Sequence, residues 1–93
     1  MKNILRVIKA LADENRLKIL QMLNGAELCV CHILEGLEVA PSTVSKHLSI
    51  LEQAGLIETR KKGRWVHCRL PKSPAPEVKS ALKWLASSFE RKI

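Results

Sequence analysis

Residues 41–55, which read PSTVSKHLSILEQAG, decide the fold of this 93-residue chain. The proline suits the first turn of a helix, and the closing Ala-Gly pair suits its end. Val44, Leu48 and Leu51 recur at helical spacing and predict the buried face. The outward face then carries small hydroxyl and basic side chains: Ser42, Thr43, Ser45, Lys46 and His47.

Three further helices are expected ahead of this stretch. Residues 3–12 carry apolar side chains at helical spacing, and Asp13 can cap a second helix that Asn24-Gly25 terminates. A short third helix is expected from about residue 30, and residues 38–40 form a tight connection to the fourth. Two short helices joined in this way are typical of a helix-turn-helix.

After residue 55 the spacing of apolar residues changes from helical to strand-like. Residues 56–60 are β-like, residues 61–63 form a basic turn, and residues 64–70 alternate like a returning strand. A proline-containing linker then leads to a last helix. The sequence predicts a mainly α (α+β) single domain over residues 1–93, a winged helix-turn-helix with a two-stranded wing and an extra helix at each end. Its expected parts are a helix-turn-helix at 30–55, a wing at 56–70 and dimerisation helices at 3–12 and 76–91.

Composition bounds the functions that this chain can have. The net charge of +7 predicts an acidic partner, nucleic acid first and an anionic membrane surface second. No apolar run approaches the roughly 20 residues of a membrane span, and no signal-peptide block opens the chain. We therefore expect a cytoplasmic protein without membrane contact. The chain shows no nucleophile with a base and an orienting group, so we expect neither an enzyme nor an organic cofactor.

Only three aromatic residues are available to the core, which favours a partner subunit. We expect a homodimer formed by the apolar stripes of the first and last helices, although part of that surface must pack within the subunit. The stripes consist of Ile4, Leu5, Ile8, Leu11, Val78, Leu82, Leu85 and Phe89, with Trp84 at the edge.

The polar face of residues 41–55 and the expected wing together suggest contact with DNA. Such a helix can enter the major groove, and a basic hairpin tip can follow the phosphate backbone or an adjacent minor groove. The alternative is that both are simply solvated surfaces. Four basic residues within five positions favour DNA contact: Arg60, Lys61, Lys62 and Arg64.

Two thiols stand two residues apart just ahead of the helix-turn-helix, at Cys29 and Cys31. Thiolates are soft ligands that select thiophilic ions, so the pair suggests an ion sensor. The alternative is two incidental buried thiols. A disulfide between them is disfavoured because this spacing strains the bond.

Four motifs in the same order resemble the ArsR/SmtB family of metalloregulatory repressors. Residues 42–57 resemble its recognition helix, residues 63–66 (GRWV) its wing, residues 11–17 (LADENRL) its first helix junction and residues 27–31 (ELCVC) its metal-binding box. The resemblance covers roughly residues 4–70. It implies a homodimeric repressor that leaves its double-stranded operator DNA when a toxic metal or metalloid binds.

The chain departs from that family's pattern in the metal box. His32 stands where an Asp is common, and Leu34 stands where arsenic sensors carry a third Cys. Members that sense zinc often use Asp and His on the last helix, but residues 76–93 contain no His, Cys or Asp. The box by itself therefore supplies only two thiolates.

Cys68 is the candidate for a third metal ligand. In winged-helix topology residues 28–30 commonly pair with residues 67–70, so Cys68 could complete a three-thiolate site for arsenic(III) or antimony(III) as inducer. Against this, strand alternation turns Cys68 toward the core, where a free Cys often serves as a small hydrophobe. A four-coordinate zinc would need His32 or His67 in addition. A divalent soft metal (cadmium, lead or zinc), thiol oxidation, or a non-sensing architectural DNA-binding module remain alternatives.

Overall fold

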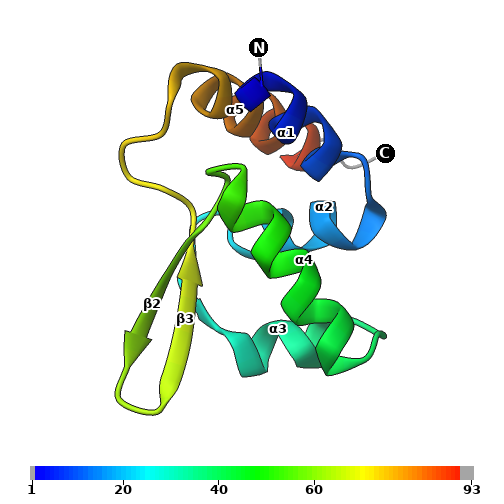
Figure 1. The fold of residues 1–93 in the computed structure, drawn as a ribbon, viewed down its shortest axis with the longest axis vertical. Coiled ribbons are helices and arrows are strands. Elements are labelled where there is room, and N and C mark those ends of the chain that lie inside the picture. The colour runs from blue at the N-terminus through cyan, green and yellow to red at the C-terminus, as the bar shows by residue number, and fades with distance from the viewer. Residues whose placement is uncertain (1, 91–93) are drawn as a thin grey trace.

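The computed structural model describes residues 2–90, which form five helices and three strands (Figure 1). The helices are α1 (Lys2–Leu11), α2 (Glu14–Met22), α3 (Val30–Gly36), α4 (Pro41–Gln53) and α5 (Pro76–Glu90). The strands are β1 (Leu28–Cys29), β2 (Glu58–Lys62) and β3 (Trp65–Arg69). This is the predicted winged helix-turn-helix, with α3 and α4 as its two helices. Residue 91, the last of the expected final helix, lies outside the described residues.

Capping residues set the limits of the helices as the sequence predicts. The Asp13 carboxylate accepts the backbone N–H of Arg16 at 3.1 Å, so it satisfies a free donor in the first turn of α2. Gly55 has a φ of +78° just after α4, a conformation that residues with a Cβ rarely adopt. The chain therefore turns sharply out of α4 toward the wing.

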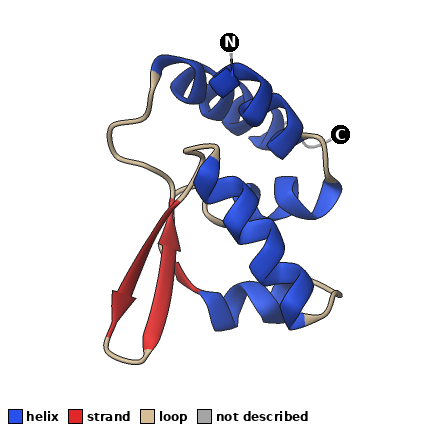
Figure 2. Cartoon of the chain, viewed as in Figure 1, coloured by secondary structure: helices blue, strands red, loops and turns tan. Residues whose placement is uncertain are grey.

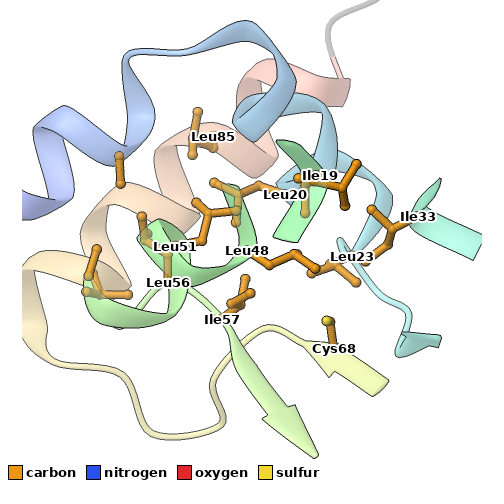
Figure 3. Packing of buried hydrophobic residues seen from close by; sticks show 14 of the residues in the cluster. Ile19, Leu20, Leu23, Ile33, Leu48, Leu51, Leu56, Ile57, Cys68 and Leu85 are labelled. Atoms are coloured by element: carbon orange, nitrogen blue, oxygen red, sulfur yellow. The ribbon is translucent and has the colours of Figure 1, made fainter. Parts of the chain in front are cut away.

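The core is centred on α4, whose Val44 and Leu51 are fully buried. They pack with apolar side chains of α2 and with Leu56 and Ile57, which follow α4 (Figure 3). Because α4 contacts both α1 and α2, its orientation is fixed by the body of the domain. Its opposite side is exposed to solvent.

The wing belongs to an antiparallel sheet of order β1-β3-β2, so the expected two-stranded wing has a short third strand. Leu28 pairs with Cys68 and Cys29 pairs with His67, which confirms the predicted pairing of residues 28–30 with 67–70 except at Val30, where α3 already begins. The β2–β3 hairpin extends beyond the helices (Figure 2). Val66 lies two residues before Cys68 and therefore on the same face of β3. It is nevertheless exposed, because this part of the hairpin extends beyond the core.

Helices α1 and α5 pack side by side at one end of the molecule (Figure 1). Val78 and Leu85 of α5 are buried within their own subunit, which corrects their expected place at a dimer interface. Two members of the same stripes, Leu82 and Phe89, pack against this core while remaining partly exposed. The large apolar side chains left exposed here are Ile4, Leu5, Ile8 and Trp84.

No helix within residues 2–90 is both long enough and apolar enough to cross a membrane.

Candidate metal centre and nucleic-acid interface

The outward face of α4 carries most of the side chains predicted to read DNA. Ser42, Ser45 and Lys46 are exposed, and Thr43 is partly exposed. They project from a helix whose other side is held in the core by Val44 and its neighbours. Small hydroxyls on such a face permit close approach to a groove, and the lysine can reach a phosphate or a base edge.

His47 does not belong to this face, contrary to the sequence-based prediction. Its side chain is buried, with Nδ1 3.1 Å from Arg16 Nη1 and Nε2 4.0 Å from Asp13 Oδ1. The spacing of positions 44, 47, 48 and 51 places His47 on the apolar face, and this signal was present in the sequence. Arg16 also donates to the carbonyls of Lys9 and Ala10, so the cluster ties α4 to the α1–α2 junction.

The hairpin presents the basic residues of the predicted wing to solvent. Arg60, Lys61, Lys62 and Arg64 are all exposed, around a turn at Gly63 with a φ of +63°. Lys62 Nζ lies 2.8 Å from Glu27 Oε2, which joins the wing to the segment before β1. The wing thus forms a basic surface, and Lys62, next to its turn, contacts the segment that leads to the cysteines.

The structure brings Cys29 and Cys31 together as free thiols, with their sulfur atoms 2.7 Å apart. Cys29 is the N-cap of α3, and its Sγ accepts the backbone N–H of Cys31 at 3.4 Å. The thiol of Cys31 donates to the same sulfur. This hydrogen bond, together with burial, raises the pKa of Cys31 above its ordinary value.

The thiol pair lies between the two surfaces proposed for DNA. A cavity of about 450 Å³ is bordered by both cysteines, by Ser45 and Ser49 of α4, and by Arg64 of the wing. A second cavity, of about 300 Å³, is lined by Cys29, Cys31, His32, Trp65 and His67. An ion held here would sit next to the recognition helix and the wing at once.

Cys68 faces away from this pair. Residues directly opposite one another in an antiparallel pair share a face, so Cys68 lies with Leu28 and Cys29 with His67. Figure 3 shows the Cys68 side chain directed into the buried cluster. It has no exposed surface, and burial, with the nearby Glu52 and Cys29, raises its pKa to about 11. The expected three-thiolate set is not assembled.

Glu27 and Trp65 lie within motifs that the sequence analysis identified, but it gave neither of them a role at the site; Trp65 lines the smaller cavity. The Glu27 carboxylate lies 3.5 Å from His67 Nδ1 and 3.9 Å from Arg69 Nη1, in addition to its contact with Lys62. The hydrogen bond from Lys62 lowers the pKa of Glu27. Glu27 is close to Cys29 along the chain, and the pairing of β1 with β3 is what brings His67 to this carboxylate. Within residues 2–90, no three His, Cys, Asp or Glu side chains are already gathered closely enough to hold an ion.

Comparison with known proteins gives an independent view of this arrangement. The sequence model described as "Bacterial regulatory protein, arsR family" matches residues 13–59, which run from the cap of α2 into β2. This segment contains the helix-turn-helix and both cysteines of the pair.

Three relatives illustrate the similarity. The arsenical resistance operon repressor of Escherichia coli K12 is 44% identical over 76% of this chain and 62% of its own length. A CadC homolog from Staphylococcus aureus, a cadmium resistance transcriptional regulatory protein, is 38% identical over 73% of this chain and 57% of its own. The homodimeric winged helix-turn-helix DNA-binding domain Mb0332 of Mycobacterium bovis, a possible ArsR-family regulator, matches 94% of this chain and 78% of that domain, with a TM-score of 0.77 and 29% identity. The chain thus spans less than two thirds of the first two proteins.

Proposed function

Since the chain belongs to the arsR family of bacterial regulatory proteins, we propose that it is a repressor released from DNA by arsenic(III) or antimony(III). The proposed inducer site is Cys29 and Cys31, and the proposed DNA-bound form is a homodimer. The observation that carries the proposal is the position of two adjacent thiols between α4 and the wing. The family is one of regulators, not of enzymes, as the sequence predicts.

The dimer is supported by an apolar surface that the subunit leaves uncovered. Ile4, Leu5 and Ile8 on α1 are each about half exposed, and Trp84 of α5 is 64% exposed. Exposed apolar surface of this kind commonly marks a protein interface. The similar Mycobacterium domain is described as homodimeric. A pairing through α1 and α5 leaves α4 and the wing of each subunit free.

DNA binding is supported by the combined face of α4 and the hairpin. Ser42, Ser45 and Lys46 are exposed on the helix, and the wing adds a run of basic side chains. Phosphate contacts of this kind dominate affinity and weaken as salt rises. The net charge of +7 agrees with such a surface.

The donor set at the thiol pair fits a soft ion. Two sulfurs on one side of a cavity can bind the same thiophilic ion, and thiolates prefer such ions to hard cations. Both cysteines must lose their protons to become ligands. Because the pKa of Cys31 is raised, the ion has to compete with a firmly held proton there.

Transmission to the DNA face follows from the role of Cys29 as the cap of α3. A sulfur engaged by an ion can no longer serve the Cys31 backbone N–H in the same way, so the first turn of α3 changes. Helix α4 follows α3 after a short connection, and Ser45 borders the same cavity. A coupling of about 1–3 kcal/mol between ion and DNA is common for such linked sites.

The test is a DNA-release titration with a duplex selected from a random library for tight binding. We expect arsenite and antimonite to release the wild-type protein, and Cys29→Ser and Cys31→Ser to remain bound. Cys68→Ala is the matched control and should respond as the wild type does.

Arsenite release that persists in both serine variants would contradict the proposal. Release only by cadmium or zinc, release by peroxide alone, or constant affinity with every thiophile would replace it with a divalent-metal sensor, an oxidation sensor or an architectural protein, respectively.

A further inference from the structure

His67 shares the face of the sheet on which Cys29 lies. The two residues are directly opposite one another in the β1–β3 pair, where Cβ atoms are about 5 Å apart. Both also line the cavity of about 300 Å³, together with Cys31. A nitrogen donor from the wing and two sulfur donors from the start of α3 therefore border the same space.

Glu27 lies beside the imidazole of His67, close enough to act as its outer partner. Its Oε2 lies 3.5 Å from Nδ1, and both side chains are roughly a quarter exposed. When Nδ1 carries the proton and donates it to Glu27, Nε2 is left with a free lone pair. A carboxylate on one imidazole nitrogen and a metal on the other is the usual arrangement around metal-binding histidines. The structure thus supplies the outer partner of such a site.

Cys68 cannot take this place without a change of the fold. Its side chain is fully buried on the opposite face of the sheet, among the apolar residues of the core. His67 is partly exposed, and it lines the same cavity as the two thiols. The donor set available on the cavity side is two sulfurs and one nitrogen.

We propose that Cys29, Cys31 and His67 form a mixed sulfur–nitrogen site for a divalent cation of the zinc and cadmium class. The inference rests on the proposed role of Cys29 and Cys31 as thiolate ligands, and it adds His67 Nε2 as the third. Zinc binds both thiolate and imidazole, with solvent able to take a fourth position. Two thiolates and a neutral imidazole also balance the charge of a divalent cation.

His32 is the matched control for His67. It lines the same cavity but lies exposed on α3, one residue after Cys31. The two variants His67→Ala and His32→Ala each remove one imidazole from the lining of this cavity. Only the first removes the imidazole that lies beside Glu27.

The experiment titrates Co²⁺ and Cd²⁺ into the reduced full chain and follows thiolate-to-metal charge-transfer absorption. We expect His67→Ala to weaken binding of both ions by at least about tenfold, since loss of one ligand or of its support has effects of this size. His32→Ala should stay within about twofold of the wild type by the same scale. Glu27→Gln should weaken binding to an intermediate degree. In the wild type, Cd²⁺ should shift the ¹⁵N NMR signal of His67 Nε2.

Unchanged Cd²⁺ affinity in His67→Ala, equal losses in the two histidine variants, or an unmoved Nε2 signal would each overturn the inference. The NMR measurement on the wild type decides the question even if a variant folds poorly. Arsenite binding through the thiol pair should survive His67→Ala. If arsenite does not release the wild-type protein from DNA although Co²⁺ still binds through His67, the proposed inducer is rejected and the proposed role of His67 as a ligand stands.

Discussion

The two faces of the β1–β3 pair give the same kind of residue two different roles. On one face Cys68 lies with Leu28, fully buried, with a pKa raised to about 11. On the other, Cys29 lies with His67 beside a cavity that Cys31 also borders. One residue of register separates Cys68, which packs in the core, from Cys29, which is also buried but borders a cavity, because strand side chains alternate between faces. A thiol's role is thus set by its face of the sheet.

The largest difference between the two faces is expected when a charged side chain replaces a thiol. Cys68→Asp is expected to lower the free energy of unfolding by at least about 3 kcal/mol, because an unpaired charge would enter the core. Cys31→Asp is the control and should cost much less, since this side chain reaches solvent. Urea unfolding followed by circular dichroism measures both, and equal costs would show that the two faces are not distinct.

Thiol alkylation should separate the faces without any mutation. Iodoacetamide at pH 8 is expected to modify Cys31 much faster than Cys68, because Cys31 is partly exposed whereas Cys68 is fully buried with a pKa raised to about 11. Peptide mapping by mass spectrometry over time gives the two rates. Comparable rates in the folded protein would place Cys68 on an accessible face.

Alkaline pH should weaken the fold through the core-facing thiol. Its pKa is raised from an ordinary value of 9.0 to about 11, so the neutral thiol stabilises the fold fully below pH 9. That contribution is lost as pH rises through the folded-state pKa, by about 1 kcal/mol at pH 10. Unfolding of the reduced, metal-free wild type and of Cys68→Ala at pH 8 and 10 isolates this loss. A difference between the two proteins that does not change with pH would contradict it.

The smallest effect is expected for Cys29→Ser. Cys29 is buried too, but serine is a good N-cap and its hydroxyl can accept the Cys31 backbone N–H in place of the sulfur, so the free energy of unfolding should change by less than about 0.5 kcal/mol. Cys68→Ser, which leaves a hydroxyl in the core, should cost about 1–3 kcal/mol. Thermal unfolding of the two variants sharpens the comparison, and the reverse order would refute it.

Local patterns were sufficient for much of the fold. The Asp13 cap, the limits of α4, the hairpin and the pairing of residues 28–30 with 67–70 all follow from the sequence, because each depends on neighbouring residues or on a common topology. His47 was misplaced although its spacing from Val44 indicated the buried face. The division of the α1 and α5 stripes between core and surface could not be predicted, because it depends on how the two helices pack.

The sequence by itself determined a winged helix-turn-helix with a basic wing and a pair of thiols at its hinge. Helical and strand periodicity, caps and turn residues are local, and they point to a single answer here. Only the tertiary structure decided which donors surround those thiols. The β1–β3 register turns Cys68 into the core and brings His67 to the side of Cys29 and of Glu27. Such a choice between faces depends on contacts between residues about forty positions apart, which no local pattern encodes.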